Sequence, residues 1–160
     1  MKAPIRIRAL LGVGLASYVG TLACQTQDPI GIYELVTAGT QPLPAIGSRI
    51  LSYEGGTLHS ARLELKEGGG LQGQIVASFT DSGTVTDTML LTGRWEGHRA
   101  TVRISYQYSE FRWQGGLRSF RAGRPVNGVL TRSELTLPEL AGFDERWFGE
   151  ATPLHFRHVD

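Results

Sequence analysis

The sequence feature that most constrains the fold is an apolar periodicity of two residues, which recurs through most of the chain. In the segment 100–108 the apolar positions are Ala100, Val102, Ile104, Tyr106 and Tyr108. Successive side chains of a β-strand point to opposite faces, so this alternation predicts a strand with one buried and one solvated face. The segments 61–66 and 71–79 follow the same rule, and the second places Ser78 on the solvated face. Each is predicted to be a half-exposed antiparallel strand.

Glycine residues separate these alternating segments. The chain has 21 of them, and most stand where a turn needs a positive φ angle, as in the runs 54–56, 68–70 and 96–98. We therefore expect eight or nine strands joined as hairpins. Their predicted ranges are 31–37, 49–53, 58–66, 71–80, 84–95, 99–108, 125–131, 134–137 and 153–158.

Hairpins in this number predict an all-β fold, a single antiparallel up-and-down meander. Closing into a barrel is the simplest way to remove the exposed edges, so we expect a closed or partly open barrel; a flattened two-sheet sandwich is the alternative. An eight-stranded barrel holds one small ligand or is filled by its own side chains. Small residues such as Gly73 and Gly93 favour a hollow interior, whereas large ones such as Trp95 and Tyr106 favour a filled one.

The N-terminal segment has a different pattern. Lys2, Arg6 and Arg8 precede an uncharged stretch at residues 9–23, which is typical of a cleavable secretory signal. This stretch is shorter than the roughly 20 residues that span a bilayer as a helix, which disfavours a permanent membrane anchor. We predict a signal peptide, with an N-terminal signal helix, at 1–23, a tether at 24–30 and one β-barrel domain at 31–160.

Cleavage after Ala23 makes the only cysteine, Cys24, the first residue of the mature chain. The segment Gly20-Thr21-Leu22-Ala23-Cys24 resembles the lipobox of bacterial lipoproteins. The resemblance implies acyl chains on Cys24 that hold the protein on a membrane. Gln25, where an aspartate commonly marks retention at the inner membrane, implies an outer-membrane lipoprotein facing the periplasm. The alternative is an unlipidated periplasmic or secreted protein, cut at the same place, in which Cys24 is a chance cysteine.

A second resemblance concerns the body of the chain. The residues Gly31-Ile-Tyr-Glu-Leu-Val36, followed by Gly39-Thr-Gln-Pro-Leu-Pro44, resemble the first strand and turn of small bacterial lipoproteins with a lipocalin-like domain. The Gly-x-Trp match that ends at Trp95 and the Leu-Thr-Leu hairpin at 135–137 are similar to that family too. The resemblance covers most of residues 31–158 and implies a lipocalin-like barrel, but it carries no binding residue over to this chain.

Charge and motif content exclude several classes of function. Without Lys2, Arg6 and Arg8 the 16 basic residues fall to 13, against 15 acidic ones, and this net charge of −2 argues against nucleic acid as a partner. A metal site is disfavoured because there is one cysteine, and because His155 and His158 would point to opposite faces of a strand. The sequence has neither a nucleophile elbow nor a phosphate-binding loop before a helix. We therefore expect no enzymatic activity, no catalytic residue, no metal and no cofactor.

Two segments, 109–125 and 138–152, are longer than the other connections. The first combines three aromatic residues with four arginines and one glutamate, and the second combines three aromatic residues with four acidic residues and one arginine. Either the two insertions pack on each other over one end of the barrel, or they form a lid or a docking face for an anionic lipid head group, a glycan or an envelope protein.

These observations leave two hypotheses for function. In the first, the barrel is a ligand-binding module for an apolar or lipid-like small molecule. The residues expected to contact it are Trp95, Tyr106, Tyr108, Phe111, Arg112, Trp113 and Phe120. In the second, the protein is a non-enzymatic envelope scaffold or assembly accessory, solid inside, that binds a protein partner through the insertions 109–125 and 138–152.

Overall fold

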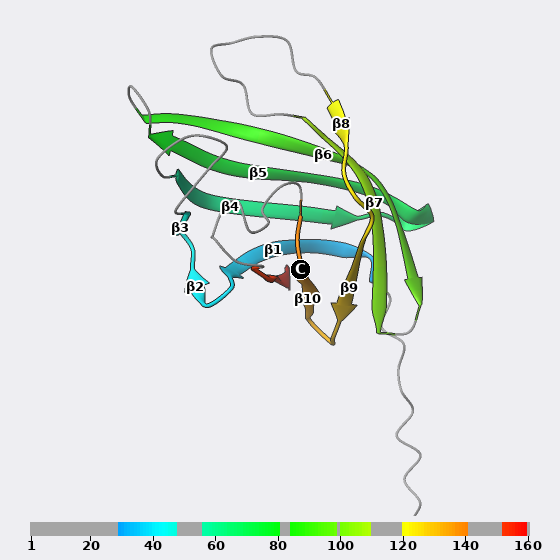
Figure 1. Cartoon of the computed structure of the whole chain (residues 1–160). Helices are drawn as coiled ribbons and strands as arrows, with labels where there is room; N and C mark the ends of the chain where they lie inside the picture. Colours follow the sequence, from blue (N-terminus) through cyan, green and yellow to red (C-terminus); the bar gives the residue numbers. More distant parts are fainter. Residues whose placement is uncertain are drawn as a thin grey trace, which may run out of the picture.

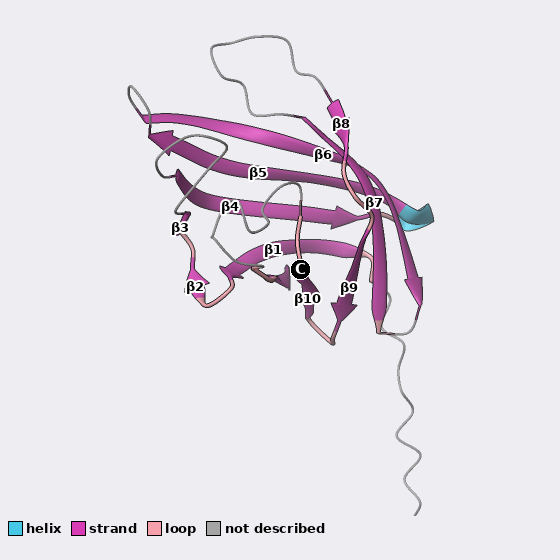
Figure 2. Cartoon of the chain, viewed as in Figure 1, coloured by secondary structure: helices cyan, strands magenta, loops and turns pink. Residues whose placement is uncertain are grey.

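The computed structural model describes residues 29–47, 56–80, 84–98, 100–109, 120–140 and 152–159 (Figure 1). Nearly all regular structure in these ranges is β-strand, as Figure 2 shows. The elements are β1 (Gly31–Ala38), β2 (Gln41–Pro42), β3 (Ala45–Gly47), β4 (Gly56–Leu65), the 3₁₀ turn η1 (Glu67–Gly69), β5 (Gly70–Thr80), β6 (Thr84–His98), β7 (Thr101–Ser109), β8 (Phe120–Ala122), β9 (Val126–Leu130), β10 (Glu134–Leu137) and β11 (Leu154–Val159).

The sheet closes into a barrel because β1 pairs with two different strands. It lies antiparallel to β11, with Ile32 opposite Val159, and antiparallel to β4, with Ile32 opposite Glu64. The order around the barrel is β1-β4-β5-β6-β7-β9-β10-β11, and β11 returns to β1. These eight strands follow one another around the barrel in chain order. The predicted all-β, antiparallel up-and-down meander is therefore confirmed in its closed form.

Three short strands lie beside the barrel. β2 pairs with the end of β1, and β3 pairs with the start of β4, so both lie where β1 and β4 no longer pair with each other. β8 pairs with β7 at residues 107–109, whereas β9 pairs with β7 at residues 101–104. The strand β7 thus has two successive partners along its length.

The described interior is packed. One cluster of buried apolar residues spans all eight barrel strands, and Tyr33 and Phe156 are each 1% exposed. Small residues do not leave room beside them, because a Cβ added to Gly73 would lie 2.7 Å from Cδ2 of Leu63. Leucine side chains therefore occupy the space in front of this glycine, as expected for an interior at the density of a crystal. The described inward side chains therefore form one packed cluster around this glycine.

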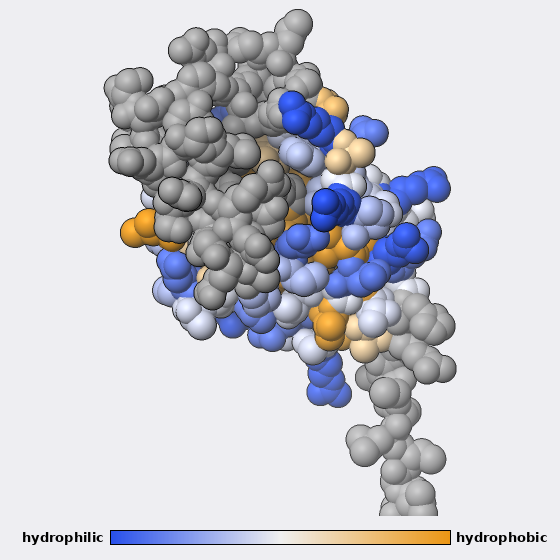
Figure 3. Space-filling model, viewed as in Figure 1, coloured by the Kyte–Doolittle hydropathy of each residue, from blue (hydrophilic) through white to orange (hydrophobic). Residues whose placement is uncertain are grey.

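The polar residues of the alternating pattern lie on the outer wall of the barrel. On β4, for example, Arg62 is exposed and Glu64 half-buried, while Leu63 between them is buried. On the side of the molecule that Figure 3 shows, the described residues are mostly hydrophilic, with some hydrophobic side chains among them. The exposed large apolar residues are Ile30, Val36, Ile46, Leu90, Phe120 and Val129.

Eight of the nine predicted strands are present, with ends that differ by at most three residues. The ninth, 49–53, and the signal helix within 1–23 lie outside the described residues. Two side chains were predicted wrongly. Ser78 is buried rather than solvated, because it lies against the ring of His59, and Ala100 is exposed because the chain turns there before β7 begins. The strands β2, β3 and β8 were not predicted, since two or three residues are too few to show a period.

Candidate functional site

A groove of about 480 Å³ lies on the outer wall, over strands β4, β5 and β6. Its volume falls in the range of about 300 to 1,000 Å³ that small-molecule sites occupy. The described residues that line this outer-wall groove are Arg62, Glu64, Gln72, Gly73, Gln74, Leu90, Leu91, Thr92 and Phe120. Most of them are solvated positions of the alternation, so the groove is on the opposite side of the sheet from the packed interior.

Strand pairing arranges these side chains in two rows that cross the sheet. In the first row Glu64 is opposite Gln72, and Gln72 is opposite Thr92. The second row consists of Arg62, Gln74 and Leu90. Neighbouring strands are about 4.8 Å apart, so one small molecule can contact side chains from all three strands at once.

Phe120 extends the second row beyond β6. The backbone N–H of Leu90 donates to the Oγ of Ser109 over 2.9 Å, and Ser109 is opposite Phe120 in the β7–β8 pairing. Phe120 and Leu90 are 49% and 39% exposed. The groove therefore has polar groups over β4 and β5 and two exposed apolar side chains at its other end.

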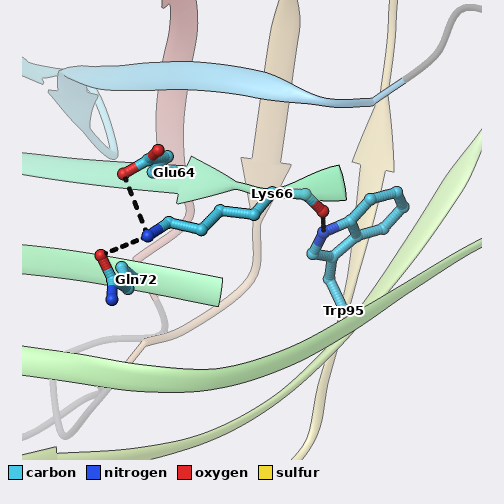
Figure 4. Close-up of polar contacts among 4 residues, drawn as sticks. All are labelled: Glu64, Lys66, Gln72 and Trp95. Carbon is cyan, nitrogen blue, oxygen red and sulfur yellow. Dashed lines mark hydrogen bonds and ion pairs between the residues drawn. The ribbon is translucent and has the colours of Figure 1, made fainter. Parts of the chain in front are cut away.

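Lys66, in the turn after β4, organises the first row (Figure 4). Its Nζ donates to Oε1 of Gln72 over 2.6 Å and lies 3.9 Å from Oε2 of Glu64. The amide of Gln72 is thereby held with its Nε2 free to act as a donor. Both side chains of the ion pair are partly exposed, at 39% and 46%, so the pair adds little stability but does restrict where these side chains point.

The position of Lys66 is in turn fixed from inside the barrel by Trp95. The indole Nε1–H donates to the backbone carbonyl of Lys66 over 2.9 Å, and the N–H of Gly69 reaches the same carbonyl over 3.2 Å. Gly68 and Gly69 have φ angles of 75° and 81°, a conformation that L side chains adopt rarely, so glycine is required for this tight connection. Trp95 thus couples the barrel interior to the lysine of the outer-wall groove.

The structure does not bring the predicted ligand-contacting residues together in one site. Tyr106 is buried and Tyr108 half-buried, and their rings pack inside the barrel with centroids 6.4 Å apart. Trp95 also packs against the interior cluster. Phe120 is on the outer wall and is the only one of these four that lines the groove. The predictions for Cys24, Phe111, Arg112 and Trp113, and for most of both insertions, lie outside the described residues.

The residues that form the polar part of the groove were not predicted as site residues. Arg62, Glu64, Gln72 and Gln74 were regarded only as the solvated side of two strands. A signal was nevertheless present, because the glycine run at 68–70 marks a tight hairpin between those strands. A hairpin that pairs Leu65 with Leu71 necessarily places Glu64 opposite Gln72, which is the observed register.

The histidine side chains make contacts that could in principle serve chemistry. The Nε2 of His59 and the Oγ of Ser78 are 2.8 Å apart, which is within reach for a base and a nucleophile. Within the described ranges, however, no carboxylate contacts His59 to complete a triad. His155 faces outward, with Nδ1 3.1 Å from Oγ1 of Thr136, whereas His158 meets the ring of buried Tyr33 edge-on at 5.2 Å. The prediction that these two histidines point to opposite faces is confirmed.

Two kinds of site are absent from the described part of the chain. No group of three or more histidine, cysteine, aspartate or glutamate side chains in it is arranged to hold a metal ion. None of its helices is both long and apolar enough to cross a membrane.

Comparisons with known proteins assign no family. No family model, no curated protein and no solved structure matches this chain.

Proposed function

We propose that this chain is an exported, lipid-anchored protein of the bacterial envelope, without catalytic activity, whose barrel recognises its ligand or partner through the outer wall. The observation that carries the proposal is the contrast between a packed interior and an open groove of about 480 Å³ on strands β4, β5 and β6. A barrel filled by its own side chains encloses no ligand, so the packing of the described interior supports recognition through the surface.

The packed interior favours the scaffold hypothesis over the apolar-ligand hypothesis. A carrier of an apolar molecule needs an enclosed apolar pocket that covers most of the ligand. Here Leu63 fills the space in front of Gly73, Tyr106 belongs to the interior cluster, and Tyr108 packs against that cluster. Native mass spectrometry of the full chain purified from its host is expected to find no stoichiometric apolar molecule. A bound lipid that Leu63→Phe displaces would contradict this part of the proposal.

The recognition surface can be tested by position-specific photo-crosslinking in cells that produce the full chain. A diazirine amino acid at position 74, on the floor of the outer-wall groove, is expected to give adducts that Phe120→Ala reduces. The matched position 127 is exposed on β9 and does not line the groove, so it should give none. Equal labelling at both positions would show that the groove is not a site.

Anchoring is tested separately through Cys24. The wild-type chain is expected to take up an alkyne-labelled fatty acid and to remain in the membrane fraction, because acyl chains add about 0.8 kcal/mol of membrane binding per buried methylene. Cys24→Ser should abolish the label and release the protein into the soluble periplasmic fraction. An unlabelled wild-type chain would overturn the lipid anchor while leaving the outer-wall site untouched.

A further inference from the structure

The polar lining of the outer-wall groove matches a ligand that both donates and accepts hydrogen bonds at many points. Its polar side chains are Arg62, Glu64, Gln72, Gln74 and Thr92. The amides and the hydroxyl offer donors and acceptors, the carboxylate only accepts, and the guanidinium only donates. Each hydroxyl of a sugar is itself a donor and an acceptor, so a glycan can satisfy every one of these groups.

The charge of the groove argues against a strongly charged ligand. Arg62 and Glu64 carry opposite charges and stand at alternate positions of the same strand face. Lys66, in the turn next to them, already donates to Gln72 and lies near Glu64. Sites for phosphate groups use several basic side chains whose charge is uncompensated. The groove therefore fits an uncharged molecule better than an anionic lipid or a nucleic acid.

The floor of the groove also argues against an extended peptide. Such peptides bind by adding a strand to a free sheet edge. The floor strand β5 is paired with β4 on one side and with β6 on the other along the length of the groove. The groove therefore presents side chains to a ligand, and β5 presents no free backbone edge there.

The apolar end of the groove is small and open. It consists of Phe120 and Leu90, which are 49% and 39% exposed and are far too little to enclose a lipid chain. An exposed aromatic ring presents a flat face of negative potential, against which the C–H bonds of a sugar ring pack well. At the polar end of the groove, Gln72 is already oriented by Lys66, so less side-chain entropy is lost on binding.

We propose that the outer-wall groove binds an uncharged glycan, with one sugar ring on Phe120 and ring hydroxyls bonded to Gln74, Gln72 and Arg62. The inference rests on the proposed function, because it names the ligand class of the same outer-wall site. Lys66 acts as a positioning residue, through Gln72, and Trp95 acts through Lys66.

The test is isothermal titration calorimetry of the full chain, extracted in detergent, with chito-, cello- and malto-oligosaccharides as probes. At least one of the three is expected to bind with a dissociation constant of about 1 mM or tighter. Phe120→Ala and Gln74→Ala should each weaken that binding by about tenfold, since truncating a central contact commonly costs this much.

Matched controls come from the same wall outside the groove. Val129 is an exposed apolar residue, Asn127 an exposed amide, and Arg103 an exposed arginine of β7. Changing each to alanine should leave the affinity within about twofold, and Arg62→Ala should weaken binding where Arg103→Ala does not. Circular dichroism of every variant checks that the barrel is folded.

The outcomes separate the glycan from the site itself. Binding of a probe that needs Phe120 and Gln74 supports the inference. If no probe binds while photo-crosslinking at position 74 persists, the outer-wall site stands and the glycan is overturned. If both fail, the proposed function is overturned as well. Binding of phosphatidylglycerol vesicles that depends on Arg62, with no response to the oligosaccharides, would replace the glycan with an anionic lipid surface.

Discussion

Strands β4, β5 and β6 present two faces whose side chains differ in packing and polarity. On the inner face Leu63 is fully buried, and Leu91 is 3% exposed. On the outer face, one residue away along the same strands, Arg62, Gln74 and Leu90 are exposed around a groove. The backbone and its hydrogen bonds are shared, so only the side chains distinguish the two faces.

The difference separates the residues that stabilise the fold from the residues that are available to bind a ligand. A buried side chain contributes through contacts on all sides, and its loss leaves a cavity. An exposed side chain contributes little to folding and is free to change its contacts when a ligand arrives. Substitutions on the inner face should therefore lower the free energy of unfolding, and substitutions on the outer face should alter binding. Four predictions test this division, beginning with the largest effect.

The largest difference in the free energy of unfolding is expected between substitutions of two phenylalanines, one in the barrel interior and one on the outer wall. Phe156 is 1% exposed, and Phe156→Ala should lower the free energy of unfolding in urea by about 3 to 5 kcal/mol. Phe120 is 49% exposed, and Phe120→Ala should change it by no more than about 0.5 kcal/mol. Similar losses for both variants would show that Phe120 supports the fold and that the two faces are not divided.

Trp95 should affect both faces, because it packs against the interior and holds the turn that carries Lys66. Trp95→Phe removes the donor to the Lys66 carbonyl and should cost about 1 to 2 kcal/mol in urea unfolding. Titration with the oligosaccharide that binds should also show a weakening of about threefold. Met89→Ala, a change of a buried residue away from that turn, is the control, since it should lower stability with no change in affinity. Unchanged affinity in Trp95→Phe would show that Trp95 does not act on the groove through Lys66.

The two glycines in the turn between β4 and β5 allow a comparison of smaller changes in stability. Gly68→Ala places a methyl group in open space at a φ angle of 75° and should cost about 1 kcal/mol in thermal unfolding. Gly69→Ala meets the carbonyl oxygen of Trp95 at 3.1 Å in addition to a φ angle of 81°, so its cost should be greater. The opposite ranking would mean that the conformation of this turn differs from that described here.

The smallest change in stability is expected for Lys66→Met. Its hydrogen bond to Gln72 and its contact with Glu64 are partly exposed, so unfolding in urea should shift by no more than about 0.5 kcal/mol. Calorimetric titration should nevertheless show about threefold weaker glycan binding, because Gln72 is no longer oriented. Lys66→Arg keeps the donor and should restore most of the affinity. If Lys66→Met binds the glycan as tightly as the wild type does, Lys66 does not position the site.

Most of the fold was predictable because the alternation of apolar and polar residues is a property of the chain alone. The inward positions on β4 and β7, such as Leu63 and Ile104, are read directly from the period, and both are buried. Short strands such as β2 and β3 were not predictable, since their pairing depends on where β1 and β4 separate. The exposure of Ser78 was misjudged because its environment is set by His59, an extra residue at a register shift of β4.

The groove was not predicted because it depends on strand registers rather than on the aromatic residues that stand out in the sequence. Trp95, Tyr106 and Tyr108 attract attention in the sequence, yet they pack into the interior, as large residues on inward positions of a small barrel commonly do. The groove instead depends on which polar residues of three strands stand in the same row. That arrangement requires the registers of two hairpins at once, since Glu64 pairs with Gln72 across β4 and β5 and Gln72 pairs with Thr92 across β5 and β6.

The pairing of β1 with β11 has a consequence for the order of events during synthesis. Ile32 is opposite Val159, so the first and the last strands of the barrel must meet to close it. Contacts between residues so far apart in the sequence form slowly, because a long loop must close first. The hairpins β4–β5–β6 can assemble early, but the barrel stays open until β11 has been made. A nascent chain would therefore expose Tyr33 and its apolar neighbours to chaperones and proteases until synthesis passes residue 159.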